Sequence, residues 1–352
     1  MKKTTLIIPT LNAEKYIDET LTSLKKNKKY IYETLFIDGG SKDKTKKKII
    51  SNFSKYKFIR KKNLNIAKSL NYGIKISKTN YISRLDSDDI ALKNRFKKQI
   101  DFLEKNKNYA LIGSNFNTFN DNKIFNQKSL PNSYDDIVLR FLITGDITIA
   151  HPTVTLRKKY LDPIKPYGYL DYSEDYSLWI KLIFKKYKIA NLKDNLNLIR
   201  VHNNQKSSIY KKESYNCMKN CYLMTMRKNK IKINKNYVDC LMIKYLGDVK
   251  LTNKSIKEFY NQKIFFTNKL IKYFNIKINV FKIQKYELEN INFQLNYNLF
   301  KIYFFYKKKF LKKILKNFKI NLIDRIFLNF QYYFFSITLF IKFFIKKKLN
   351  EI

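Results

Sequence analysis

The stretch "YISRLDSDDI", residues 81–90, ends an apolar run with three carboxylates, Asp86, Asp88 and Asp89. Like charges this close destabilise one another unless a positive group lies between them. In a chain of formal net charge +44, that group is either a basic side chain or a bound cation. Two carboxylates at a strand end can hold Mg²⁺ or Mn²⁺, which keep open positions for phosphate oxygens. The competing interpretation is that Asp88 or Asp89 caps the next helix.

Strands and helices alternate on both sides of this stretch. Ile66, Leu70 and Ile74, for example, recur every four residues, which indicates a helix. The order predicts an α/β fold with a mainly parallel sheet and helices on both faces. Ligands of such sheets bind beyond the carboxyl ends of the strands. We expect strands at residues 5–9, 34–40, 57–62 and 80–85, and helices at 13–27, 41–54, 65–77 and about 92–103, the first of them capped by Asn12.

The rest of the chain divides by composition. Residues 114–135 are polar and predict a long loop or a hairpin, and a second α/β stretch follows to about residue 202. We expect one domain over residues 1–210, divided into halves at about residue 113. Residues 211–352 hold 31 Lys or Arg but only 8 Asp or Glu, are rich in aromatic residues, and predict a separate basic helical region.

The end of the chain predicts contact with a membrane surface. Residues 326–341 are mostly apolar and are followed by Lys342 and Lys346–Lys348. The run is shorter than the ~20 residues that span a bilayer squarely. It suits a helix that lies in the cytoplasmic leaflet, on the inner face of the membrane. The alternative is a helix packed against the rest of the C-terminal region.

The composition also limits the partners and the compartment. Eight of the 72 basic residues are Arg, whereas proteins that read nucleic-acid sequence rely on Arg forks, so no specific nucleic acid is expected. The charge still attracts phosphates and anionic membranes. Three Cys give no disulfide framework, and the N-terminal apolar run is too short for a signal peptide. A reducing cytoplasm is therefore the expected compartment.

Six motifs taken together resemble the family-two glycosyltransferases of GT-A fold, over about residues 4–208. The resemblance is greatest to bacterial surface-polysaccharide glycosyltransferases with "RLDSDD" followed by "RF" and "HP" signatures. The motifs are "IIPTLN" (7–12), "FIDGGSKDKT" (36–45), "NIAKSLNYGI" (65–74), "YISRLDSDDI" (81–90), "SEDYSLWIKL" (173–182) and "LIRVHNNQKS" (198–207).

The resemblance implies a nucleotide-diphosphate sugar bound at the rim of the sheet. Asp38 would accept hydrogen bonds from the base or ribose, and Gly39 replaces the second Asp of the family motif. A UDP-sugar is favoured, although Gly39 leaves the nucleotide open. Lys68 either faces the nucleotide or is solvated. Asn65 replaces a family Gly, and nothing in the sequence explains this change, although Asn tolerates left-handed backbone. Pro9, Thr10 and Asn12 would border the nucleoside, or form a turn and a helix cap.

The resemblance also assigns the metal site. Asp86 would meet the ribose and Asp88 the cation, Mn²⁺ or Mg²⁺, with His202 as a third ligand. Imidazole suits Mn²⁺ better. Arg200 would pair with the diphosphate. Asp43 and Asp89 are expected to be helix caps.

A second pair of carboxylates supplies the base. Asp175 matches the family's catalytic base, with Glu174 orienting the acceptor or partnering Asp175; the alternative for both is a capping charge at a helix start. His151 is an acceptor-side or a structural residue. Trp179 is expected in the core, with sugar stacking as the alternative.

The resemblance therefore implies an inverting, metal-dependent glycosyltransferase. Its acceptor would be a glycan or a lipid-linked saccharide, as in lipopolysaccharide or capsule synthesis. One alternative is a polyprenyl-phosphate sugar transferase of the same fold, although such enzymes commonly carry clear membrane spans. A nucleic-acid-binding protein would explain the charge but not the rim carboxylates. An inactive scaffold would explain Gly39 and Asn65.

Overall fold

The computed structural model describes residues 2–52, 56–120, 123–145, 148–168, 172–202, 205 and 209–233, with ten further single positions up to Phe274. The chain forms two compact units, one of residues 1–142 and 146–231, the other of residues 143–145 and 232–352. The candidate site lies wholly in the first unit. The apolar run at residues 326–341 lies outside the described residues. Among the described helices, none is both long and apolar enough to cross a bilayer.

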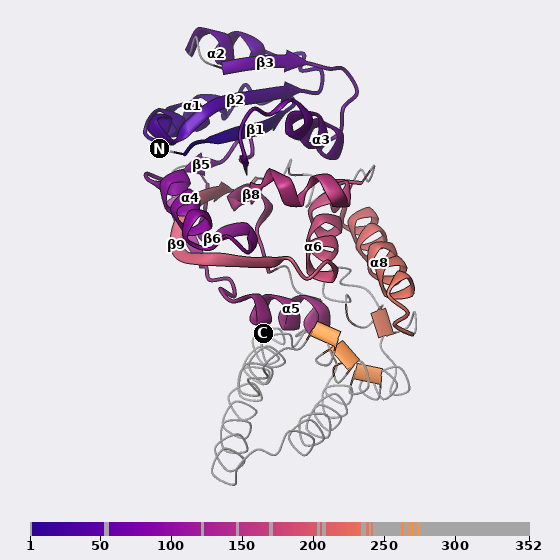
Figure 1. Ribbon diagram of the computed structural model, residues 1–352. Helices are drawn as coiled ribbons and strands as arrows, with labels where there is room; N and C mark the ends of the chain where they lie inside the picture. The colour runs from indigo at the N-terminus through magenta and orange to yellow at the C-terminus, as the bar shows by residue number, and fades with distance from the viewer. Residues whose placement is uncertain are drawn as a thin grey trace, which may run out of the picture. The chain divides into compact units, whose positions relative to one another are not determined.

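Four parallel strands begin the sheet, as the alternating pattern predicts (Figure 1). They are separated by helices, and every predicted strand and helix of this half is present, within a few residues of its expected bounds. The strands are β1 (Thr4–Thr10), β2 (Ile31–Asp38), β3 (Tyr56–Arg60) and β4 (Tyr81–Arg84), and the helices are α1 (Ile17–Lys25), α2 (Thr45–Asn52), α3 (Ile66–Ile76) and α4 (Arg95–Lys105).

The second half extends the same sheet with mixed directions. β8 (Thr155–Arg157) pairs antiparallel with both β4 and β6 (Tyr109–Asn120), and β9 (Lys188–Arg200) runs parallel to β6. The two-residue strand β5 (Ile90–Ala91) pairs with β9. Across the described residues the order is β3-β2-β1-β4-β8-β6-β9-β5, with β7 (Lys123–Lys128) paired to β6. The β6–β7 hairpin confirms one of the two alternatives for residues 114–135.

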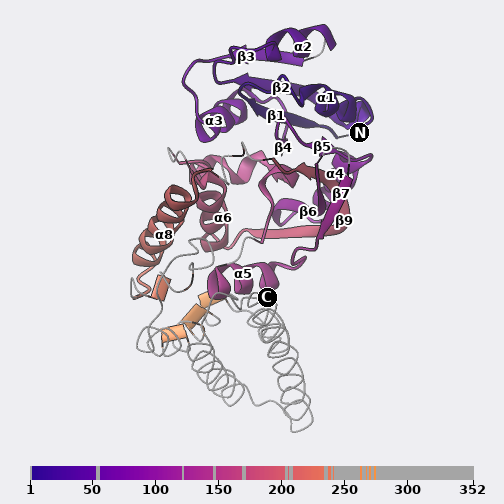
Figure 2. The same cartoon turned by 180° about the vertical axis from the view of Figure 1, so that it is seen from behind.

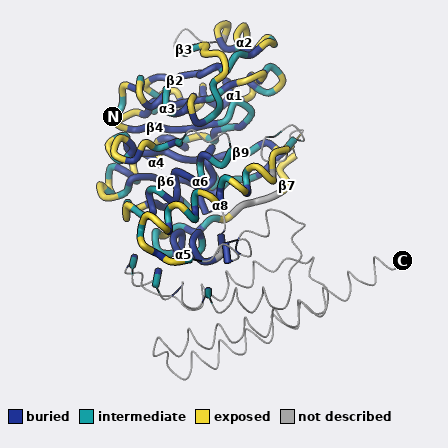
Figure 3. The backbone as a smooth tube through the Cα atoms, turned by 90° about the vertical axis from the view of Figure 1, so that its right-hand side faces the viewer, coloured by how far each residue is buried: buried dark blue, intermediate teal, exposed yellow. Residues whose placement is uncertain are grey.

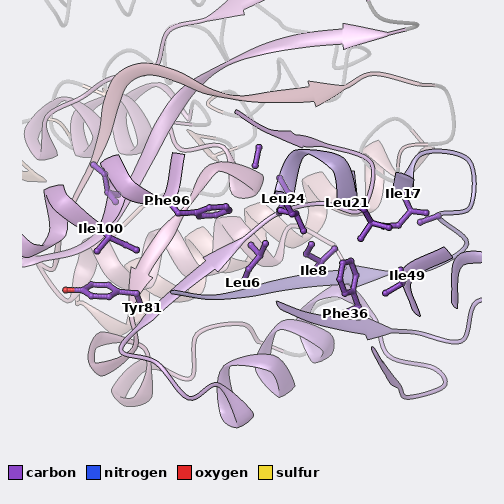
Figure 4. Packing of buried hydrophobic residues seen from close by; sticks show 14 of the residues in the cluster. Leu6, Ile8, Ile17, Leu21, Leu24, Phe36, Ile49, Tyr81, Phe96 and Ile100 are labelled. Atoms are coloured by element: carbon purple, nitrogen blue, oxygen red, sulfur yellow. The ribbon is translucent and has the colours of Figure 1, made fainter. Parts of the chain in front are cut away.

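The core forms where helices cover both faces of the sheet (Figure 4). Successive strand residues point to opposite faces. Leu6 and Ile8 pack with Leu21 of α1 and Phe96 of α4, all of them at most 1% exposed. Ile7 points to the other face, where a Cβ added to Gly73 of α3 would lie 2.7 Å from its side chain. The predicted GT-A type sheet, with helices on both faces, is confirmed.

Two helices complete the described part of the first unit. α6 (Glu174–Phe184) and α8 (Lys211–Lys228) lie side by side (Figures 1 and 2). The Tyr222 hydroxyl of α8 donates a hydrogen bond to the carbonyl of Leu142 in α5 (Tyr134–Thr144). Leu142 ends the segment of residues 1–142 that belongs to the first unit. α8 therefore belongs to the first unit, and the domain boundary expected at residue 210 remains a prediction.

The central strands β2 and β4 are mostly buried (Figure 3).

Candidate active site

The loop after β2 is organised around a buried carboxylate. Asp38 is fully buried and accepts hydrogen bonds from the amides of Gly40 and Ser41 and from the Ser41 hydroxyl. The Gly39 amide donates to the Thr10 carbonyl at 2.9 Å, which joins this loop to the end of β1. A Cβ at Gly39 would lie 2.9 Å from the Leu64 carbonyl oxygen, so this loop has no room for the family's second Asp.

Asn12 joins β1 to the same loop. Its backbone is left-handed, with φ of 50°, and its side-chain oxygen accepts the Lys42 amide at 2.9 Å. The prediction that Asn12 caps the first helix is wrong, because a turn at residues 13–16 delays the start of α1 to Ile17. Asp43 does accept the Thr45 amide at the first residue of α2, as a cap would. Pro9 and Thr10 end β1 at this rim.

The start of α3 lies beside this loop. The Asn65 side chain caps α3 by accepting the Lys68 amide at 2.8 Å, and its φ is −75°. The backbone at Asn65 is therefore not left-handed, and capping accounts for an Asn at this position. Lys68 is exposed in the first turn of α3. The Asn63 amide donates to the Gly39 carbonyl, so the loop before α3 adjoins the Asp38 loop.

The three aspartates after β4 come together, with ligand oxygens within 4.8 Å of one another. Arg84 supplies the basic side chain that the sequence required. Its guanidinium, 4% exposed, pairs with both carboxylate oxygens of Asp86, at 2.9 and 2.5 Å. Burial raises the pKa of Asp86 to about 6, although Arg84 opposes this shift.

A candidate metal site lies next to this pair. The Nε2 atom of His202 lies 2.9 Å from Asp88 Oδ2, and both side chains are about a quarter exposed. Asp86 and Asp89 lie beside Asp88, with ligand oxygens within 4.8 Å of one another, and His202 contacts Asp88. Carboxylate oxygens with a neighbouring imidazole suit a divalent cation, Mn²⁺ in particular. Of the residues predicted to bind the cation, the structure joins His202 to Asp88, and Asp88 to Asp86.

Asp89 does not cap a helix, so that prediction is wrong. It is 1% exposed and accepts the Arg200 amide at 2.9 Å, and burial raises its pKa well above the usual range. The following residues form β5, and Asn94 precedes the first residue of α4. Asp89 therefore ties the aspartate loop to the end of β9.

Arg200 is held by contacts within the protein. Its guanidinium lies 2.8 Å from Glu19 Oε1 and donates to the Asp88 carbonyl at 3.0 Å. It lies over the rings of Tyr16 and Phe119, at 4.4 and 4.3 Å from their centroids. A contact with a diphosphate remains a prediction for Arg200.

The second pair of carboxylates begins α6. Burial raises the pKa of Asp175, and nearby His151 opposes the shift. Its Oδ1 accepts the Tyr176 amide, while Glu174 Oε1 lies 3.4 Å from His151 Nδ1. Trp179, at 1% exposure, packs edge-to-face against His151, so the core position expected for it is confirmed.

Arg84 connects the two groups of carboxylates. Burial alone would lower the pKa of Arg84, but the charges of Asp86 and Glu174 raise it. The charge of Glu174 in turn contributes to the raised pKa of Asp86. The carboxylates predicted for the donor and for the base therefore lie within electrostatic reach of one buried cation.

Three polar residues were missed from the sequence. Arg84 stands inside the quoted motif, and Arg95 and Gln99 occupy the buried face of α4 one turn apart. Arg95 donates to the Arg84 carbonyl, and Gln99 bonds both the Thr153 carbonyl and the Thr155 hydroxyl. The sequence signal for Arg95 and Gln99 is that they are polar residues on an otherwise apolar helix face.

Comparison with known proteins finds similarity to glycosyltransferases. Residues 5–164 match the family described as "Glycosyl transferase family 2". An amylovoran biosynthesis glycosyltransferase of Erwinia amylovora is 33% identical over 40% of this chain, and the chain spans about half (52%) of that relative. An uncharacterized glycosyltransferase of Haemophilus influenzae is 28% identical over 88% of this chain and 96% of its own length. The crystal structure of S. aureus TarS 1–349 with UDP-GlcNAc shares the fold, with a TM-score of 0.55 and 19% identity over 82% of this chain and 90% of that one.

Proposed function

We propose that the chain belongs to glycosyltransferase family 2, whose model matches residues 5–164, and that it transfers a sugar with inversion from a nucleotide-diphosphate donor. The acceptor is a glycan or a lipid-linked saccharide in the synthesis of a bacterial surface polysaccharide. The relative named for amylovoran biosynthesis supports this acceptor class.

One observation carries the mechanism. Arg84 lies against Asp86 and within electrostatic reach of Glu174, next to Asp175. An inverting transfer needs charge stabilisation at the leaving diphosphate and a base on the opposite side of the sugar. The arrangement supports both tasks within one site, with residues 1–113 as the donor half and residues 114–210 as the acceptor half.

The chemistry assigns one task to each group. The acceptor oxygen attacks the anomeric carbon and its proton passes to the Asp175 carboxylate. The bond from that carbon to the diphosphate oxygen breaks, and the nucleoside diphosphate leaves with the electron pair. Asp88, Asp86 and His202 would hold the divalent cation, which when bound offsets the negative charge of the diphosphate. Burial raises the pKa of Asp175 and so makes its carboxylate a stronger base.

The donor in this proposal is a UDP-sugar, in line with the UDP-GlcNAc in the TarS crystal. In this proposal the nucleoside of the donor contacts Asp38, Gly39 and Lys68. It is bordered by Pro9, Thr10 and Asn12. Arg200 fixes the loop that carries Asp88. His151 and Trp179 lie on the acceptor side, behind Glu174.

The proposed location is peripheral, on the inner face of the cytoplasmic membrane. A hollow of about 790 Å³ beside α2 has mostly basic side chains among its charged lining residues, including Lys42, Lys46, Lys47 and Arg60, and one carboxylate, Asp43. Within the described part of the chain, these three lysines have no carboxylate partner. Each Lys near an anionic surface contributes about 1 kcal/mol of binding. This basic hollow supports binding to anionic lipid head groups.

Vesicle binding tests the location. Reversing Lys42, Lys46 and Lys47 to Glu should weaken sedimentation with phosphatidylglycerol vesicles by roughly 100-fold. The matched control reverses three scattered exposed lysines, Lys75, Lys105 and Lys185, with the same change in net charge. Equal losses in both triple variants would show that total charge, rather than this hollow, determines binding.

Product analysis tests the function. A panel of nucleotide sugars with Mn²⁺ is scored for transfer and for a rise in melting temperature, because a donor stabilises the folded state. The anomeric configuration of the product is then read by NMR. We expect Asp88→Asn and Asp175→Asn each to lower kcat by at least about 100-fold. The control is Asp101→Asn, which breaks an exposed pair with Lys97. Retention of transfer by both site variants would refute the mechanism.

A further inference from the structure

A side chain of α3 holds a residue 96 positions away. The Asn71 amide nitrogen donates to the Tyr167 carbonyl at 2.6 Å, and the Tyr167 amide donates to Asn71 Oδ1 at 3.3 Å. Such a two-bond clasp fixes both the position and the direction of the backbone at Tyr167. Because the start of α3 adjoins the Asp38 loop, the clasp links the donor half to the segment that precedes α6.

The Tyr167 side chain continues this connection. Its hydroxyl lies 2.9 Å from His151 Nε2, and the two residues are 3% and 6% exposed. On the other side of the imidazole, Nδ1 lies 3.4 Å from Glu174 Oε1. We assign the ring proton to Nδ1, which faces the Glu174 oxygen, so that Nε2 accepts from the Tyr167 hydroxyl.

The surroundings keep this arrangement in one protonation state. Burial, aided by the charge of Arg84, lowers the pKa of His151 well below its usual range, so the imidazole is neutral. Burial raises the pKa of Tyr167, so its hydroxyl stays a donor. In this assignment the Tyr167 hydroxyl donates to Nε2, and the Nδ1 proton faces Glu174.

We propose that Tyr167 and His151 are positioning residues, which transmit the placement of α3 through Asn71 to Glu174 and so orient the base Asp175. This inference rests on the proposed function, because it takes Asp175 as the base. It assigns roles to Asn71 and Tyr167, which the motifs leave unassigned, and replaces a direct acceptor contact at His151 by action through Glu174.

The imidazole can be observed directly, since the chain has only two histidines. In full-length protein labelled with ¹⁵N-histidine, a His202→Asn variant identifies the signals of His151. We expect a neutral ring with its proton on Nδ1, unchanged from pH 5.5 to 8. A proton on Nε2, or a charged ring in this range, would overturn the inference. This readout needs no activity, so it stands even if no donor supports transfer.

Kinetics then separate positioning from packing. Tyr167→Phe removes the hydroxyl and keeps the ring; we expect kcat to fall about tenfold while the KM for the donor changes less than twofold. Tyr160→Phe is the matched control, because it removes a tyrosine hydroxyl that bonds the Lys107 carbonyl outside the site. Unchanged kcat in Tyr167→Phe would refute a positioning role.

A pair of amide substitutions adds a rescue test. The amide of Asn at position 151 can replace Nδ1–H toward Glu174, whereas the longer Gln places its amide near the Nε2 position. We therefore expect His151→Asn to retain several-fold more kcat than His151→Gln at equal melting temperature. The reverse order would show that contact with Tyr167 alone is what matters.

Discussion

The loop after β2 and the cluster around Arg84 hold carboxylates in different ways. Asp38 accepts hydrogen bonds from Gly40 and Ser41, two and three residues away in sequence, and Arg60 of the neighbouring strand lies 3.7 Å from it. Asp86 pairs with Arg84, which also faces Glu174, some ninety residues further along the chain. Local backbone amides need only the loop to form, whereas the Arg84 cluster needs the whole first unit. A substitution in the loop after β2 should therefore perturb only that loop, whereas a substitution in the Arg84 cluster should destabilise the whole first unit.

Arg84→Ala should have the largest effect. It leaves Glu174 buried, and Asp86 with its side chain 34% exposed, without their shared cation. Breaking a fully buried pair costs about 3–5 kcal/mol, and the partial exposure of Asp86 places the expected loss at the lower end of that range. Urea unfolding measures this loss as a lower midpoint at constant slope. Lys98→Ala, which breaks an exposed pair with Asp194, should cost under about 1 kcal/mol. Similar losses of unfolding free energy in Arg84→Ala and Lys98→Ala would show that the Arg84 cluster contributes no more to stability than an exposed ion pair.

Gly39→Asp should have the next largest effect, although it restores the family residue. Its Cβ would lie 2.9 Å from the Leu64 carbonyl, so the loop has to shift, at about 1–3 kcal/mol. Thermal unfolding measures the change, and Gly39→Ala separates the Cβ clash from the added charge. A variant as stable as the parent would mean that the loop adapts freely.

The proposed role of Asp175 as the base predicts the pH profile of transfer. Because burial raises its pKa above that of a free Asp, the acid limb of kcat/KM should lie at higher pH than about 3.9. Below the raised pKa the base is protonated, and the rate should fall tenfold per pH unit. Melting temperatures over the same range provide the control. A limb that coincides with unfolding would contradict the assignment.

Asn65→Ala should have the smallest effect. It removes the cap of α3 at the Lys68 amide, which costs about 1 kcal/mol. Asn65→Asp keeps an acceptor at this position and should retain most of the stability. Equal losses in the two variants, measured by urea unfolding, would show that capping is not the role of Asn65.

The same contrast explains what the sequence predicts. Helix α3 follows from Ile66, Leu70 and Ile74, because their spacing is a local property of the chain. The rim after β1, β2 and β4 follows from strand order alone. Asp89 was predicted as a cap because nothing near it in sequence reveals its bond to Arg200, 111 residues away.

The base side shows the same limit. Glu174 and Asp175 were recognised from a motif, whereas Asn71 and Tyr167 belong to no motif that names a role for them. Their contact depends on α3 and the segment before α6 meeting in space. Gly39 is a case between these two. Its departure from the family is visible in sequence, but the Leu64 carbonyl that accounts for it is not.

The guanidinium of Arg200, enclosed between two aromatic rings at the end of β9, helps to fix the register of that strand. Side chains alternate along a strand, so a slip of one residue would put Val201, 40% exposed, where Arg200 now stacks between two rings. The same slip would withdraw His202 from Asp88. By making a one-residue slip of β9 unfavourable, Arg200 helps to fix the distance between an imidazole and a carboxylate that lie 114 residues apart.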